Sequence, residues 1–89
     1  MRIKSGMILN TVGEDTVAVP VGKATEDFHG LIRLNETGAE IWKALEEDTS
    51  REAIVERLLA KYSEADRNAV ARSVDSFLEK LAQAGLLEQ

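Results

Sequence analysis

His29 is the single histidine of this 89-residue chain, which contains no cysteine. A catalytic histidine needs a nucleophile and an orienting partner placed beside it, and the sequence offers no such pair near His29. The missing cysteines exclude disulfides, thiolate nucleophiles and cysteine-based zinc or iron–sulfur sites. We therefore expect no catalytic residues, and we expect His29 to be an ordinary polar residue of a strand or loop.

Acidic clusters and glycines are the remaining candidates for ligand chemistry. Glu46, Glu47 and Asp48 are consecutive, which is typical of a solvated helix end rather than of a metal site. The six glycines are isolated from one another, so no phosphate-binding loop is present. The sequence therefore predicts no metal, no cofactor and no enzymatic activity.

The net charge of −5 is distributed unevenly along the chain. Residues 1–34 carry four basic and four acidic side chains, whereas residues 35–89 carry seven basic and twelve acidic ones. Proteins that bind phosphates usually present a basic stripe, so this balance argues against nucleic acid and anionic membranes. Peptides, proteins and neutral ligands remain as partners.

Targeting and membrane segments are not evident in the sequence. The basic start at Arg2 and Lys4 is not followed by an apolar run or a cleavage site, so it does not read as a secretory signal. No segment approaches the roughly 20 apolar residues that span a bilayer. We expect a cytoplasmic protein.

The hydropathy pattern changes from period two to a helical period near residue 34, which predicts an α+β fold. Residues 7–12 and 16–21 are β-branched runs around a short polar linker with a glycine, the signature of a hairpin. Pro20 should end the pairing, because proline cannot donate to a strand ladder. Residues 22–27 are predicted to be a loop and residues 28–34 a third strand, so that the three strands form an antiparallel sheet.

Three helices are predicted after the sheet, within a single domain that spans residues 1–89. Asn35 is a good N-cap for a helix over about 36–46, and Thr49 to Glu52 fits a capping box for a second helix that ends near Tyr62. The third helix is predicted to start at Ser63 and to stop before Gly85. Gly38 is unfavourable within a helix, which suggests that another backbone passes close to it.

A helix-turn-helix is the main alternative interpretation, since the second and third helices could form one and the hairpin could serve as a wing. This would make the protein a DNA-binding regulator. The exposed side of the third helix would carry Arg67, Arg72 and Lys80, but acidic residues are interspersed with them and would face phosphates at a cost. Among these, Asp75 and Glu79 are either a solvated face or an acidic rim for a basic partner.

Trp42 is the only tryptophan and lies on the apolar stripe of the first helix, so we expect it to anchor the core. The third strand has neither a proline nor a run of lysines. A three-stranded sheet has edges, and an edge without such blocking residues can accept another strand.

Residues 27–39, with the sequence Asp-Phe-His-Gly-Leu-Ile-Arg-Leu-Asn-Glu-Thr-Gly-Ala, resemble the PqqD family (coenzyme PQQ synthesis protein D), as do Ile41-Trp42 and Leu45. The second helix, the segment Val74-Asp75-Ser76-Phe77-Leu78 and the closing Gly85-Leu86-Leu87 are also similar to that family. The resemblance covers nearly the whole chain.

The resemblance implies a winged-helix-like domain that acts as a non-catalytic peptide chaperone in the biosynthesis of ribosomally made, modified peptides, including PQQ. Such domains bind the leader segment of a precursor peptide as a strand added to the third strand, beside the third helix. They present it to a modifying enzyme, often a radical S-adenosylmethionine (SAM) protein. By position, the peptide-binding residues implied are Gly30, Leu31, Ile32 and Arg33 on the strand and Val70, Ala71, Val74, Asp75 and Leu78 on the helix.

Several details remain open at this point. The sequence does not identify the precursor peptide or the modifying enzyme. It also does not reveal which alternate residues of the third strand face an added peptide. As partners we expect a leader peptide and a modifying enzyme, without nucleic acid or membrane, for a protein that is a monomer or a weak dimer.

Overall fold

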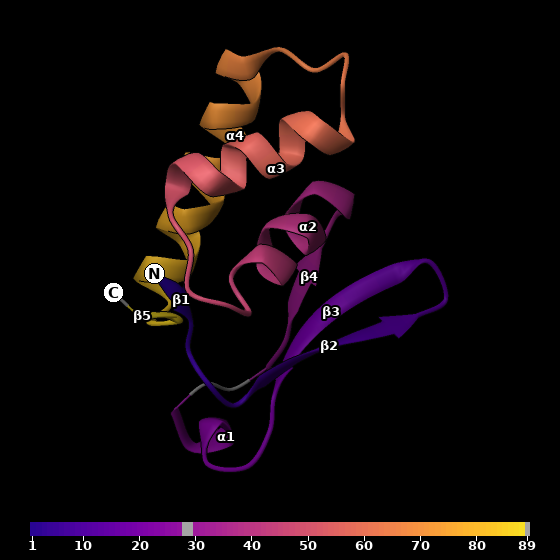
Figure 1. Ribbon diagram of the computed structural model, residues 1–89. Helices are drawn as coiled ribbons and strands as arrows, with labels where there is room; N and C mark the ends of the chain where they lie inside the picture. Colours follow the sequence, from indigo (N-terminus) through magenta and orange to yellow (C-terminus); the bar gives the residue numbers. More distant parts are fainter. Residues whose placement is uncertain (28–29, 89) are drawn as a thin grey trace.

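The computed structural model describes residues 1–27 and 30–88 (Figure 1). Phe28 and His29, which the sequence analysis assigned to the third strand, lie outside the described residues. The elements in chain order are β1 (Arg2–Ile3), β2 (Met7–Val12), β3 (Asp15–Pro20), α1 (Ala24–Asp27), β4 (Ile32–Leu34), α2 (Glu36–Ala44), α3 (Arg51–Lys61), α4 (Arg67–Gln83) and β5 (Leu87–Glu88). The predicted α+β fold, a three-stranded antiparallel sheet followed by three helices, is confirmed.

The sheet has the strand order β2-β3-β4, with both pairs antiparallel. Gly13 and Glu14 form a two-residue turn between β2 and β3, because Val12 lies opposite Asp15. Gly13 has φ +64, and no residue other than glycine has a positive φ among the described ones. A glycine with positive φ at the first central position is typical of a type II′ turn, whose twist matches that of the strands.

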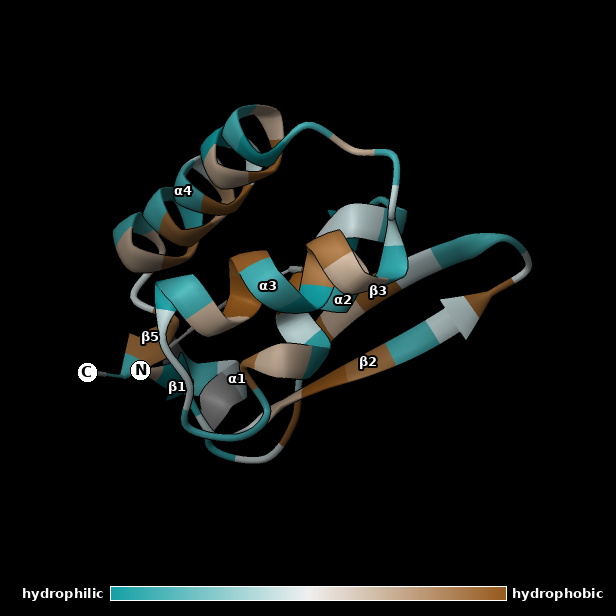
Figure 2. Ribbon diagram, turned by 45° about the horizontal axis from the view of Figure 1, so that its top comes forward, coloured by the Kyte–Doolittle hydropathy of each residue, from teal (hydrophilic) through white to brown (hydrophobic). Residues whose placement is uncertain are grey.

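The two faces of the sheet differ in their neighbours. Ala18 and Leu34, on the inner face, are buried in the hydrophobic core. On the outer face, Ile8 and Val12 are 49% and 62% exposed, whereas Val17 in the central strand is 9% exposed. Figure 2 shows the hydrophobic first half of β2, which carries apolar side chains on both faces. The helices therefore cover one face of the sheet and leave the other open.

Each of the three long helices begins at a capping side chain that accepts a hydrogen bond from the backbone three residues ahead. Asn35, Ser50 and Asp66 accept from Gly38, Ala53 and Ala69. The cap at Asn35 agrees with the sequence analysis, whereas the second helix is capped by Ser50, one residue after the Thr49 of the predicted capping box. The predicted start of the last helix at Ser63 was wrong, because residues 62–66 form a turn closed by a bond from the Ala65 N–H to the Tyr62 carbonyl. Asp66, three residues after Ser63, caps the helix instead, and both residue types are good N-caps.

β3 ends at Pro20, where the pairing was predicted to end. Other features differ from the prediction. The third strand is assigned to three residues only, Ile32–Leu34. Residues 24–27 form the short helix α1 where a loop was predicted. Finally, β1 and β5 pair with each other, which the sequence analysis did not predict, and they bring the two ends of the chain side by side (Figure 1). Two-residue strands are too short to give a period-two signal.

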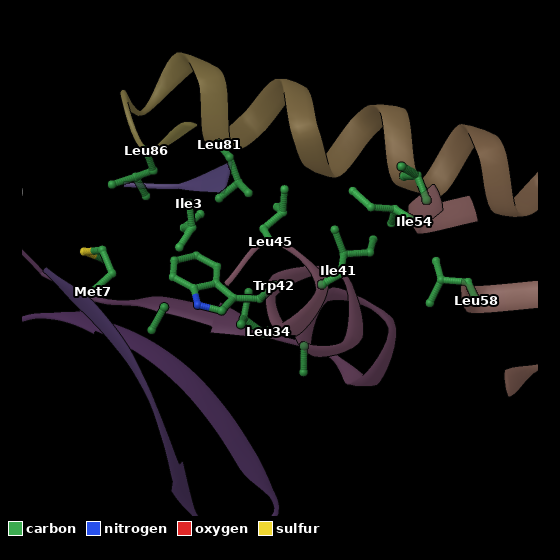
Figure 3. Close-up of a cluster of buried hydrophobic side chains, with 14 of the residues drawn as sticks. Ile3, Met7, Leu34, Ile41, Trp42, Leu45, Ile54, Leu58, Leu81 and Leu86 are labelled. Carbon is green, nitrogen blue, oxygen red and sulfur yellow. The ribbon is translucent and has the colours of Figure 1, made fainter. Parts of the chain in front are cut away.

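Trp42 lies at the centre of the core, as predicted, and is 1% exposed. In Figure 3 its ring lies among Ile3, Met7 and Leu34, with Leu45 of the following loop close by. The core thus joins the N-terminal segment, the sheet and the first long helix. Because α2 starts directly after β4, burial of Trp42 also fixes β4 relative to the helices.

Candidate functional site

The edge of β4 that faces away from β3 has no strand beside it among the described residues. The Val21 N–H donates to the Gly6 carbonyl at 2.7 Å, so odd-numbered residues of β3 point their main-chain groups toward β2. Neighbouring residues in an antiparallel ladder point these groups in opposite directions. Ala18, opposite Ile32, therefore points toward β4, while Arg33, opposite Val17, points its N–H and C=O to the open edge.

A groove of about 500 Å³ separates the start of α2 from α4, close to the C-terminal end of β4. From the end of β4 and from α2 it is lined by Asn35, Thr37, Gly38 and Ile41. From α4 it is lined by Ala69, Arg72, Ser73, Ser76, Phe77 and Lys80. Asn35 directly follows β4 and is part of the groove lining, so the groove begins where the open strand ends.

Gly38 forms part of the groove wall because α2 and α4 approach each other closely there. A Cβ atom at this position would lie 3.1 Å from Cε1 of Phe77 and 3.1 Å from Oδ1 of Asn35. The expectation that another backbone passes close to Gly38 was wrong, because the neighbours are the ring of Phe77 and the capping side chain of Asn35. The glycine lets Phe77 reach the floor of the groove without displacing the cap.

Of the strand residues implied by the resemblance, Leu31 and Arg33 are exposed, whereas Ile32 is half-buried and packs against the core. Gly30 is exposed, with φ +105, a conformation that favours glycine. The four residues thus lie together at the open edge, and Arg33 presents both its side chain and its main-chain groups there. Whether they contact a peptide remains a prediction.

None of the five helix residues implied by the resemblance lines the groove, and Ala71 and Asp75 face α3. Val74 is fully buried, and Val70, Ala71 and Leu78 are half-buried against the core. The lining is formed by residues one or two positions away on the same helix. Their role as peptide contacts remains a prediction. The residues of α4 that face the groove are a different set, which includes Ser73, Ser76 and Phe77.

Asp75, the fifth of these residues, is held by α3. Nη2 of Arg51 donates to its Oδ2 at 2.9 Å, and Nε donates to Oδ1. This two-pronged hydrogen bond lowers the pKa of Asp75 below its usual value and raises that of Arg51. Asp75 therefore joins α4 to α3 across 24 residues of sequence. Sequence spacing gave no signal of this pair.

A second charged cluster joins α2 to α3. Lys61 donates to Glu40 at 2.6 Å, while Arg57 and Lys43 lie 3.7 and 3.8 Å from the same carboxylate. The hydrogen bond from Lys61 is the main reason that the pKa of Glu40 lies below its usual value. The cluster fixes the helix that carries one wall of the groove.

Metal-binding chemistry finds no support in the described part of the chain. Residues 1–27 and 30–88 contain no group of three or more His, Cys, Asp or Glu side chains that could hold a metal ion. Over the same residues, no helix has both the length and the apolar character needed to cross a membrane. The geometry described above is suited to binding an extended chain.

The family model for coenzyme PQQ synthesis protein D (PqqD) matches residues 7–87. The chain belongs to the PqqD family. The match includes the open edge, the groove and every helix, so it covers the complete candidate site. It therefore confirms the family resemblance found in the sequence. A search of curated protein sequences gave no match.

Two solved structures are similar over nearly the whole PqqD-like chain. One is described as "TbiB1 in Complex with the TbiA(beta) Leader Peptide", with 30% identity, a TM-score of 0.76, and coverage of 99% of this chain and 95% of the other. The second, "Lasso peptide synthetase B1 complexed with the leader peptide", has 18% identity, a TM-score of 0.72, and coverage of 99% and 96%. At that lower identity the second structure supports the fold alone.

Proposed function

We propose that this protein binds the leader segment of a ribosomally made precursor peptide. The leader adds as a fourth strand to the open edge of β4 and continues into the groove beside α4. The observation that carries the proposal is the direction of the Arg33 main-chain groups, which face solvent at the edge next to the groove. Strand addition uses such groups for affinity and side-chain pockets for specificity.

The comparisons support this proposal independently of the geometry. The chain belongs to the PqqD family, and the similar structure at 30% identity holds a leader peptide. In the same proposal the protein has no catalytic role. It presents the bound leader to a modifying enzyme, for which a radical SAM protein is the candidate that the family suggests.

Amide hydrogen exchange followed by NMR tests the proposed edge directly. The probe is a peptide recovered by this protein from a displayed library of random peptides about 16 residues long, which is long enough to follow both the edge and the groove. On binding, the Arg33 amide should exchange more slowly, because it becomes hydrogen-bonded. The amides of Ile32 and Leu34 already face β3 and should be protected in the free protein as well.

Leu9 provides the matched control on the opposite edge of the sheet. It lies opposite Ala18, which points toward β4, so the Leu9 N–H faces the open edge of β2. Its exchange should not change when the peptide binds. Protection of Leu9 without protection of Arg33 would place the peptide on the wrong edge, and recovery of no peptide at all would contradict the proposed function.

A further inference from the structure

The basic side chains of this acidic protein are distributed unevenly between paired and unpaired positions. Most of them form ion pairs, such as those of Arg51 with Asp75 and Lys61 with Glu40. In the part of the chain that the structure describes, Arg33, Arg72 and Lys80 form none, and Lys23 is the fourth such residue. Three of these four cations lie at the open edge or in the groove.

Among residues 1–27 and 30–88, none that lines the groove carries a carboxylate. Arg72 and Lys80 are its charged residues, and the rest of its lining is apolar, hydroxyl-bearing or amide-bearing. The nearby acidic residue Asp75 is directed toward Arg51 of α3. The net charge of −5 is thus locally reversed at the place where a peptide would lie. Of the two residues considered from the sequence as an acidic rim, Asp75 is thus held by α3, while Glu79 is exposed next to Lys80 and outside the groove lining.

We infer that the bound peptide segment is acidic, with Asp or Glu side chains that pair with Arg72 and Lys80 while an apolar side chain between them contacts Phe77. This inference rests on the proposed function and specifies its ligand. The two cations are eight residues apart on α4, about 12 Å at the rise of an α-helix. An extended chain covers that length in about four residues, so two acidic side chains on one face would reach both cations. Arg33 is outside the groove lining, so the charge pairing is assigned to Arg72 and Lys80 alone.

These charges contribute more to the choice of the peptide than to the strength with which it binds. Complementary charges at an exposed site accelerate association and reject peptides of the wrong sign. A basic leader would meet unpaired cations in a groove that offers it no carboxylate. The protein would therefore bind acidic leaders in preference to basic ones with the same apolar pattern.

Selection from the same random library, followed by measurement of dissociation constants, tests this inference. The recovered peptides should be enriched in Asp and Glu. Arg72→Gln and Lys80→Gln should each weaken binding about two- to five-fold, the range of exposed ion pairs, and the double variant more than either. Raising the salt from about 50 to about 500 mM should weaken binding to the parent protein more than binding to the double variant.

Lys23→Gln is the matched control, since it removes an unpaired cation that is outside the groove lining. It should leave the dissociation constant unchanged within about two-fold, which separates local pairing from a change in net charge. In a second arm, Arg72→Glu should prefer a peptide in which one acidic residue is replaced by lysine. Restored binding of that combination identifies a direct contact.

The outcomes separate this inference from the proposed function. Recovered peptides that protect the Arg33 amide but show no acidic enrichment, and that bind the double variant as tightly as the parent, would overturn the inference and leave the function intact. Failure to recover any peptide would overturn both. Acidic enrichment together with weaker binding to the variants, but not to Lys23→Gln, would support the charge assignment.

Discussion

The side chain of Trp42 connects three parts of the core, because its ring touches the N-terminal segment, the sheet and the helices. Trp42→Ala should destabilise the domain by about 3–5 kcal/mol, a large part of a total stability of about 5–15 kcal/mol. Chemical denaturation of the two proteins measures the difference. A loss below about 1 kcal/mol, typical of surface positions, would contradict the central place of this ring in the core.

Glu40 gives the second prediction at the scale of single residues. Its carboxylate is 12% exposed, and the hydrogen bond from Lys61 lowers its pKa, so the ionised form stabilises the folded state. A lowered pKa contributes stability above the ordinary glutamate value of about 4.3, and this contribution is lost as the pH falls through the folded-state pKa. Glu40→Gln should therefore be less stable than the parent at neutral pH, and the difference should shrink between about pH 5 and pH 3.

Urea denaturation of both proteins across that pH range is the measurement, and we expect a difference of about 0.5–1 kcal/mol at neutral pH. Asp75 titrates in both proteins, so its effect cancels in the subtraction. Glu46→Gln, an exposed substitution just after α2, is the control and should follow the parent at every pH. Parallel curves for Glu40→Gln and the parent would show that the cluster does not stabilise the fold.

At the scale of elements, β4 allows a test with two adjacent prolines. Ile32 points its N–H toward β3, so Ile32→Pro removes a bond within the sheet and should lower the melting temperature. Arg33 points its N–H outward, so Arg33→Pro should keep the fold and weaken peptide binding at least a few-fold. A hydrogen bond is worth about 0.5–1.5 kcal/mol net, and the ring also crowds the edge.

Arg33→Ala separates the two changes made by Arg33→Pro, because it removes the side chain and keeps the N–H. Thermal melts and calorimetry with the selected peptide should place Arg33→Ala between the parent and Arg33→Pro in affinity. If Arg33→Pro bound like Arg33→Ala, the main-chain groups of this residue would not be used, and strand addition at this edge would be excluded.

Elements also show how far the sequence predicted this molecule. The hairpin, the cap at Asn35 and the buried face around Trp42 follow from local rules and are present, whereas the second helix is capped at Ser50 and not at the predicted Thr49. The sequence could not predict which side of α4 faces the groove. The apolar residues of α4 are divided between α3 and the rest of the core, and nothing in their spacing reveals that Phe77 reaches the groove while Val74 does not.

The open edge was predicted. Which alternate residues of β4 point their main-chain groups toward it could be determined only from the register of the sheet. The bond between Val21 and Gly6 establishes which residues of β3 face β4, but the register of β4 on β3 is a pairing outside the hairpin, which local sequence does not give. The Arg51–Asp75 pair is similar, since either residue alone reads as an exposed charge on a helix. Contacts between residues distant in sequence therefore determined the parts of the site that the sequence left open.

For the whole molecule, the charge distribution predicts weak interaction with DNA. The protein is net acidic, and Arg57 and Arg67 are already paired with carboxylates. Fluorescence anisotropy with mixed duplexes should show at most unspecific binding that disappears as salt approaches physiological levels. Submicromolar, sequence-selective binding at that salt would favour the winged-helix regulator over peptide recognition.

The shortness of β4 has a kinetic consequence. Arg33 is the one residue of the assigned strand with outward main-chain groups, so pairing there contributes about two hydrogen bonds, roughly 1–3 kcal/mol. Micromolar binding requires about 8 kcal/mol. Side chains in the groove must supply the remainder, so a leader lacking the right side chains should dissociate quickly, and unrelated strands should not occupy the edge for long. A short residence time also agrees with the proposed transfer of the leader to a modifying enzyme.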